Sequence, residues 1–140
     1  MLTGTLTSGI HRLTLRVYYE DTDFSGNVYH ANYLKFCERG RSDFLRVVGV
    51  DQNAMIAGKS AFVVRRLACD FLRPARFDDV ISVETTPTKM AGARFELFQR
   101  VMRGKEVLFT ADVTVAIIDG RGRPMRISPD MAAKFVIPPT

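Results

Sequence analysis

One long helical pattern among stretches of alternating hydrophobicity constrains the fold of this chain more than any other feature. From about residue 30 to residue 48 the apolar positions follow a helical stripe, formed by Ala31, Leu34, Cys37, Phe44, Leu45 and Val48. Gly49 is a natural end for that helix. A helix of roughly 18 residues is about 27 Å long, which is enough to lie across a whole β-sheet.

The remaining patterns indicate β-strands. One strand is expected before the helix, at 11–19, where apolar residues alternate with polar ones. Four more are expected after it, at 61–71, 80–88, 93–103 and 107–117. Short helices are expected at 51–58 and after Ser128. Because tight turns join the later strands, the sequence predicts an α+β fold, with an antiparallel sheet of about five strands and one long helix.

The length and composition fit one globular domain. The chain has 140 residues, of which 46% are hydrophobic and 25% charged. Residues 1–10 are expected to form a flexible leader, followed by an exposed His11, and residues 11–140 to form a single domain. No apolar run approaches the roughly 20 residues that a membrane helix needs, and the start lacks the pattern of a secretory signal. We therefore expect a cytoplasmic protein without a membrane span.

Charge and cysteine content limit the ligands. The net charge is +5, and arginine supplies 15 of the 20 basic residues. This balance suits an acidic partner protein or a small polyanion, because guanidinium groups bind oxyanions in pairs. The basic residues are dispersed, without a run of five, which disfavours a nucleic-acid partner. Two cysteines, Cys37 and Cys69, and two scattered histidines do not make a four-ligand zinc site, so we expect no metal and two buried free thiols.

The stretch YYEDTDFSGNVYH, residues 18–30, has more charge than a plain turn needs. It contains three acids, Glu20, Asp21 and Asp23, and aromatic residues lie on both sides of them. It leads into the N-terminus of the predicted helix, where unpaired N–H groups and the positive end of the helix dipole can hold a developing oxyanion. A carboxylate beside that point can attack an acyl carbon or activate a water. The stretch therefore predicts an acyl-transfer site without a serine or cysteine nucleophile.

Several segments of the sequence match one family signature. They are Tyr19-Glu20-Asp21-Thr22-Asp23, Gly26, Val28-Tyr29-His30-Ala31-Asn32-Tyr33, Phe36-Cys37-Glu38-Arg39, Phe71-Leu72-Arg73-Pro74-Ala75, Asp78-Asp79, Asp119-Gly120, Arg123-Pro124 and Ile127. Together they resemble the hot-dog fold acyl-CoA thioesterases of the 4-hydroxybenzoyl-CoA thioesterase type, and most closely the YbgC branch, which is associated with the Tol-Pal system. The resemblance covers residues 12–135, roughly.

This resemblance implies a sheet wrapped around one long helix, and a homodimer or homotetramer with active sites at the dimer interface. It implies an acyl-CoA substrate, with acyl carrier protein as an alternative thiol, and no cofactor. The family's catalytic aspartate falls on Asp23, as nucleophile or general base, and His30 lies where a backbone N–H polarises the thioester carbonyl. Many YbgC relatives have small residues where this chain has Phe24-Ser25. The resemblance therefore does not predict the shape of the acyl pocket or the preferred acyl group.

Substrate binding is expected of Tyr29, Lys89 and Arg94. Tyr29 adjoins His30, and the two cations flank a predicted turn, where their charges suit the phosphates of CoA. Two other functions fit the resemblance: a non-catalytic module that binds acyl-CoA or acyl carrier protein, and a hot-dog enoyl-CoA hydratase. The intact Asp23 argues against the first, and the spacing of seven residues from Asp23 to His30 fits the second poorly.

Overall fold

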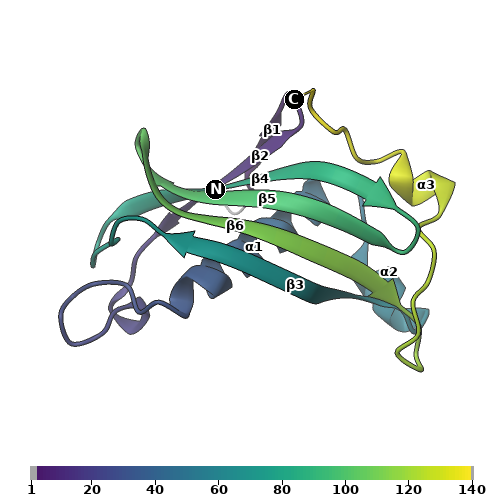
Figure 1. Ribbon diagram of the computed structural model, residues 1–140, viewed down its shortest axis with the longest axis horizontal. Coiled ribbons are helices and arrows are strands. Elements are labelled where there is room, and N and C mark those ends of the chain that lie inside the picture. Colours follow the sequence, from purple (N-terminus) through teal and green to yellow (C-terminus); the bar gives the residue numbers. More distant parts are fainter. Residues whose placement is uncertain (1–2, 140) are drawn as a thin grey trace.

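Six strands form one antiparallel sheet that curves around helix α1 in the computed structural model, which describes residues 3–139 (Figure 1). The strands are β1 (Thr5–Thr7), β2 (Ile10–Arg16), β3 (Ala61–Phe71), β4 (Val80–Ala91), β5 (Arg94–Arg103) and β6 (Glu106–Ile118). Their order across the sheet is β1-β2-β4-β5-β6-β3, and all neighbours are antiparallel. The predicted α+β fold is confirmed, with β1 in addition to the expected strands.

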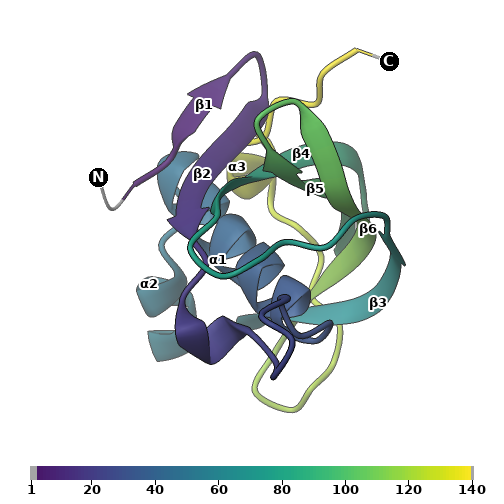
Figure 2. The ribbon, with the colours of Figure 1, turned by 90° about the vertical axis from the view of Figure 1, so that its left-hand side faces the viewer.

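The helices are α1 (Asn32–Val47), α2 (Gln52–Ala57) and α3 (Pro129–Ala132). Helix α1 lies along the concave face of the sheet (Figure 2). Its inner side is filled by Phe36, Cys37 and Phe44, each at most 1% exposed. Leu34, which the sequence pattern placed on the buried stripe, is 38% exposed, because the buried side of the helix is centred on Phe36 and Gly40 instead.

Helix α1 approaches the sheet closely at Gly40. A Cβ atom at this position would lie 2.7 Å from Cγ1 of Val83 on β4, closer than two such carbon atoms can pack. Beside it, the buried amide of Gln99 on β5 donates from Nε2 to the carbonyl of Cys37 (3.0 Å) and to Oγ1 of Thr85 (2.9 Å). These contacts fix the distance between α1 and the sheet and therefore the place of the helix N-terminus.

Strand β4 runs further than the sequence pattern predicts. The predicted end was near Pro87, but the strand continues to Ala91 through an irregularity between Pro87 and Lys89. Proline has no N–H to give to the ladder, and a bulge accommodates it within a sheet. As a result Lys89 lies within β4, opposite Glu96 of β5, and still precedes the turn that Arg94 follows.

Within the stretch for which the sequence indicates a flexible leader, the structure has strand β1. It pairs with β2, and the N–H of Gly4 before it donates to Oδ2 of Asp43 on α1 (2.7 Å). His11 was expected to be exposed, and this prediction is wrong. Its side chain is fully buried, with Nε2 lying 2.6 Å from Oδ2 of Asp43. The alternation of β2 continues inward to His11, and a carboxylate far away in the sequence provides its polar partner.

Strand β3 has a neighbour on one side only, β6, so its other side is an edge of the sheet. Large apolar side chains on or beside this strand are exposed, namely Val63, Val64, Phe71 and Leu72. An open edge with apolar side chains is a surface that natural proteins usually cover. None of the helices within residues 3–139 is long and apolar enough to cross a membrane.

Candidate active site

Asp21 anchors the loop that leads into α1. Its side chain is buried, with Oδ2 accepting from the N–H of Tyr18 (2.8 Å) and Oδ1 accepting from Nδ2 of Asn32, the first residue of α1 (3.0 Å). Its carbonyl accepts from the N–H of Tyr29 (2.9 Å). One buried carboxylate thus joins the start of the loop, its end and the helix. Asp21 therefore has a structural role in this loop.

Asp23 projects from this loop with its carboxylate exposed. Oδ1 accepts from both the backbone N–H (2.8 Å) and the hydroxyl (2.5 Å) of Ser25. These two hydrogen bonds, with a smaller contribution from the backbone of Asn27, lower the pKa of Asp23 below its ordinary value of 3.8. The carboxylate is therefore ionised at neutral pH and has a second oxygen free to face a substrate or a water.

The outer part of the loop packs on the chain segment between β3 and β4. The N–H of Val28 donates to the carbonyl of Ala75 (2.8 Å), and the N–H of Phe77 donates to the carbonyl of Gly26 (3.0 Å). Gly26 has a φ of 83°, which favours glycine. From the helix, the hydroxyl oxygen of Tyr33 accepts from the N–H of Ala75 (2.9 Å). Loop, helix and connecting segment therefore form one hydrogen-bonded unit.

The N-terminus of α1 has no compensating negative charge of its own. Ala31 occupies the cap position and provides no side-chain hydrogen bond, and the first turn of the helix contains no acidic residue. The helix is 16 residues long, so its backbone dipoles sum to a substantial partial positive charge at this end. An oxygen that gains negative charge during a reaction would be stabilised beside Ala31 and His30.

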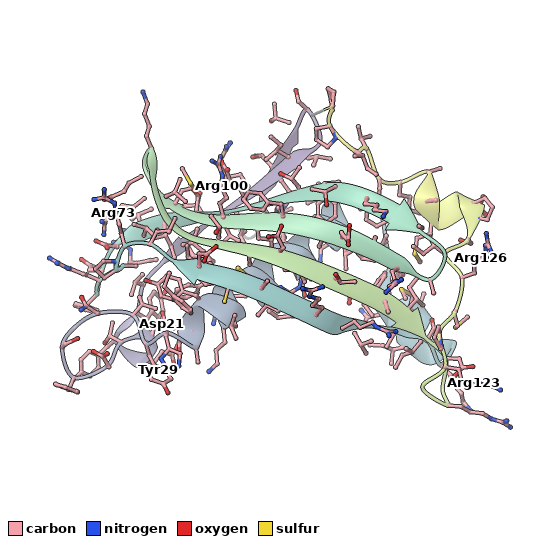
Figure 3. All side chains as sticks on the ribbon, viewed as in Figure 1. Asp21, Tyr29, Arg73, Arg100, Arg123 and Arg126 are labelled. Carbon is pink, nitrogen blue, oxygen red and sulfur yellow. The ribbon has the colours of Figure 1, made fainter. Side chains whose placement is uncertain are left out.

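Aromatic side chains surround the same helix end. The ring centroids of Tyr29 and His30 are 4.5 Å apart, and both side chains are exposed to solvent. The ring of His30 faces Phe71, at the end of β3, edge-on at 6.2 Å. Figure 3 shows Tyr29 and Asp21 at this same end of the molecule. Within residues 3–139 no hydrogen bond or ion pair joins Asp23 to His30, so the two predicted catalytic residues share a loop without touching.

Lys89 and Arg94 line one cavity on the outer face of the sheet, of about 380 Å³. Arg65 and Arg66 from β3 line it as well, and one carboxylate, that of Glu96, is among the lining residues. We call this the basic cavity. Such a group of cations in a concave site matches the charge of a polyphosphate. The sequence analysis placed Lys89 and Arg94 together, but it could not bring the β3 arginines to them, because that depends on the order of the strands.

The predicted catalytic loop, residues 18–30, and the basic cavity lie at opposite ends of the molecule. The turn between β4 and β5 is at the right-hand end of Figure 1, and the loop before α1 is at the left-hand end. The predicted catalytic residues and the predicted phosphate-binding residues therefore do not meet within one copy of the chain.

The cysteines are free, with Cys37 buried and Cys69 half-buried. Burial raises the pKa of the Cys37 thiol to about 12, so it stays protonated and is not a nucleophile at neutral pH. Within the described part of the chain, no group of three or more histidine, cysteine, aspartate or glutamate side chains is placed to hold a metal ion.

Solved structures share this architecture. A probable thioesterase from Bartonella henselae matches with a TM-score of 0.82 and 43% sequence identity, over 85% of this chain and 99% of that one. The sheet wrapped around α1, with an acidic loop at the start of that helix, is the hot-dog fold of the thioesterases. The family model described as the thioesterase-like superfamily matches residues 17–135. The chain belongs to this superfamily.

Two relatives whose names state an activity differ in the thioester that they act on. An acyl-CoA thioesterase, YbgC of Haemophilus influenzae, is 42% identical over 86% of this chain and 90% of that relative. A chloroplastic acyl-acyl carrier protein thioesterase of Arabidopsis thaliana is 28% identical over 92% of this chain and 69% of that relative. The resemblance to hot-dog thioesterases, and within them to the YbgC branch, is thereby confirmed.

Proposed function

We propose that the protein hydrolyses acyl-CoA thioesters to the free acid and CoA, with Asp23 as the reacting carboxylate. The observation that carries this proposal is an exposed, ionised aspartate on the loop that leads into a helix N-terminus whose first turn contains no acidic residue. Family membership and the similarity to YbgC support it. In this reaction a water oxygen forms a bond to the acyl carbon, the C–S bond breaks, and the water proton passes to the departing thiolate.

Asp23 serves this reaction in one of two ways. As general base it takes a proton from the water and returns it to the thiolate of CoA. As nucleophile it displaces the thiolate of CoA and forms a mixed anhydride with the acyl group, and water then splits the anhydride into the free acid and the regenerated Asp23 carboxylate, with one proton passing to the thiolate. In both cases the thioester carbonyl gains negative charge, and the N–H groups around His30 at the start of α1 stabilise it. Tyr29, half-exposed beside His30, contacts the substrate next to the carbonyl.

The open edge of β3 favours a homodimer in which two β3 strands pair. Two copies related by a twofold axis across this edge pair antiparallel, so the start of one β3 lies beside the end of the other. Strand β3 has 11 residues and is about 36 Å long. Such pairing buries Val63, Val64 and Phe71 and brings the basic cavity of one copy toward the catalytic loop of the other.

This arrangement completes the site that one copy leaves divided. The acyl group lies at Asp23 and His30 of one copy, while the phosphates of CoA reach Lys89 and Arg94 in the basic cavity of the other. The pantetheine arm of CoA joins the two along the shared edge. The dimer therefore explains why the two sets of predicted residues lie at opposite ends of the chain.

Free-thiol release from a panel of acyl-CoAs tests the activity. The panel contains short and long aliphatic acyl groups and an aromatic one, and wild type is compared with Asp23→Asn. The substitution keeps the shape of the side chain and removes its charge, so we expect kcat to fall by about 100-fold to 10,000-fold. Glu20→Gln is the matched control, because Glu20 is an exposed carboxylate of the same loop, and it should keep wild-type kcat.

Equal thiol release by wild type and Asp23→Asn would contradict the role of Asp23. If wild type binds acyl-CoA tightly without releasing thiol, the chain is a binding module instead. Hydration of crotonyl-CoA by wild type, without thiol release, would identify a hydratase. Each result excludes the proposed hydrolysis by Asp23 in a different way.

A further inference from the structure

Helix α1 has a line of side chains on the face that looks toward β3. The line consists of Leu34, Glu38, Arg41 and Leu45. Since they are spaced by three or four residues, they lie on one face of the helix. The last three line a cavity of about 60 Å³ together with residues from the start of β3. Leu34, which the structure leaves 38% exposed, continues this line toward the start of the helix.

Strand β3 runs opposite to α1 along this line. At one end, Phe71 of β3 lies edge-on to His30 at the start of α1, with ring centroids 6.2 Å apart. At the other end, Phe62 and Val64 of β3 line the cavity. Figure 1 shows that β3 ends on the side of the molecule where α1 begins. Phe71 is 52% and Val64 46% exposed. We call the exposed side chains of Leu34, Val64 and Phe71 the apolar strip, which leads from the helix N-terminus to the cavity.

A charged pair interrupts this face of α1. The guanidinium of Arg41 donates to Oε2 of Glu38 (2.8 Å) and to Oε1 of the buried Gln99 (3.0 Å). The hydroxyl of Ser42 donates to Oε1 of Glu38 (3.2 Å). Both oxygens of Glu38 thus have partners on the helix, while its side chain stays 61% exposed. Methylene groups that covered this carboxylate would remove water from it without offering a hydrogen bond, which is unfavourable.

We propose that the apolar strip binds the acyl chain of the substrate, and that the pair of Glu38 and Arg41 sets the longest chain that the site accepts. The inference rests on the proposed thioesterase activity and names the class of acyl group for it. With the thioester carbonyl beside His30, a chain that follows α1 reaches Glu38 after about 12 Å, because the helix rises about 1.5 Å per residue. An extended chain advances about 1.2 Å per bond. The strip therefore suits aliphatic acyl groups of up to about ten carbons.

The cavity beyond the pair adds little to this length. Its volume, about 60 Å³, is less than half of the roughly 150 Å³ that holds a benzene ring in an engineered protein core. It can therefore take only the end of a chain. In the proposed dimer the pairing of two β3 strands encloses the strip, so each methylene bound there leaves water and strengthens binding. Binding should improve with chain length up to the charged pair and weaken beyond it.

A chain-length series tests this limit. The acyl-CoAs run from butanoyl to hexadecanoyl, each below the concentration at which it forms micelles, and kcat/KM is measured by thiol release. For wild type we expect kcat/KM to rise up to octanoyl-CoA or decanoyl-CoA. It should be about tenfold lower for tetradecanoyl-CoA and hexadecanoyl-CoA.

Two variants should move the limit in opposite directions. Glu38→Met replaces the exposed carboxylate with an apolar side chain of similar helix propensity. It should raise the ratio of kcat/KM for tetradecanoyl-CoA to that for octanoyl-CoA about tenfold. Leu34→Trp fills the strip nearer to His30 and should lower the ratio for octanoyl-CoA to butanoyl-CoA about tenfold. Arg39→Met is the matched control, because Arg39 lies on the side of α1 that faces β2. It should leave both ratios unchanged.

Three results would overturn the inference and leave the proposed hydrolysis intact. The first is a wild-type profile that is flat or that still rises at hexadecanoyl-CoA. The second is a pair of ratios that neither Glu38→Met nor Leu34→Trp changes, because the chain would then bind elsewhere. The third is an equal change in Arg39→Met, which would assign the effect to surface hydrophobicity alone. Wild type that releases thiol from no acyl-CoA would instead contradict the proposed function, and this inference with it.

Discussion

At the scale of single residues, the ionisation of Asp23 is set within its own loop. Ser25 provides two hydrogen bonds to one carboxylate oxygen, and both favour the charged form. Because the pKa of Asp23 is lowered, the aspartate stays ready to react when the pH falls. A partner that holds one oxygen also fixes where the other points. Ser25 is thus a positioning residue for the proposed reaction.

Ser25→Ala should move the acid limb of the activity profile. The substitution removes the hydroxyl hydrogen bond and raises the pKa of Asp23 toward its ordinary value of 3.8. Wild-type kcat/KM should fall only below that value, and the variant should lose activity at a higher pH. The measurement is kcat/KM for one acyl-CoA from about pH 2.5 to pH 8, with Thr22→Ala as control. A limb that does not move would mean that Asp23 is not the titrating group.

At the scale of elements, the position of α1 depends on its contact with β4. Gly40 is the point of closest approach, and Val83 opposite it is fully buried. Gly40→Ala gains about 1 kcal/mol of helix propensity. The new Cβ, however, meets a stiff β-branched side chain at 2.7 Å, and overpacking of this kind costs about 1–3 kcal/mol.

We therefore expect Gly40→Ala to lower the free energy of unfolding, measured by urea denaturation. The double variant with Val83→Ala makes room for the added methyl group. It should show a favourable coupling between the two substitutions in a double-mutant cycle. Additive effects would show that α1 can shift away from the sheet without cost.

A second link between elements is Glu84 on β4, which joins three strands. Its carboxylate accepts from Arg12 on β2 and from Nε of Arg100 on β5 (2.9 Å). Burial alone would raise the pKa of Glu84, but the hydrogen bonds and charges of the two arginines outweigh it and lower the pKa below its ordinary value of 4.5. Its contribution to stability is therefore complete above pH 4.5 and is lost as the pH falls through the folded-state pKa.

Glu84→Gln should cost about 1–3 kcal/mol at pH 7, because two guanidinium groups lose a charged acceptor. The variant should also lose less stability than wild type between pH 6 and pH 3. Urea denaturation at a series of pH values measures both effects. Parallel pH profiles for the two proteins would contradict the role of Glu84.

The sequence predicted the elements better than the contacts between them. The long helix, the strands and the acidic loop before the helix follow from local patterns of period 3.6 and period 2, and the structure has them at those places. The partnership of His11 with Asp43 was missed, because these residues are 32 positions apart. Phe71 beside His30, and Arg65 beside Lys89, also depend on strand order. The roles of Asp23 and His30 came from the family signature and stay predictions.

At the scale of the whole molecule, the free edge of β3 is the feature on which the proposed dimer depends. Val64→Lys places a charge on that edge, and a twofold axis places two such charges near each other. We expect the variant to sediment as a monomer and to lose thioesterase activity together with the dimer. Leu6→Lys on the opposite edge strand, β1, is the control and should change neither. A monomer with full activity would contradict the shared site.

The predicted catalytic loop and the basic cavity lie at opposite ends of one subunit, and this separation has a genetic consequence. In the proposed dimer, a chain with Asp23→Asn and a chain with Arg94→Gln would each form homodimers in which both sites are damaged. When the two chains are co-expressed, every mixed dimer contains one site with both defects and one site with neither. Activity that returns on mixing would thus show intragenic complementation, with each defective allele supplying the half-site that the other lacks.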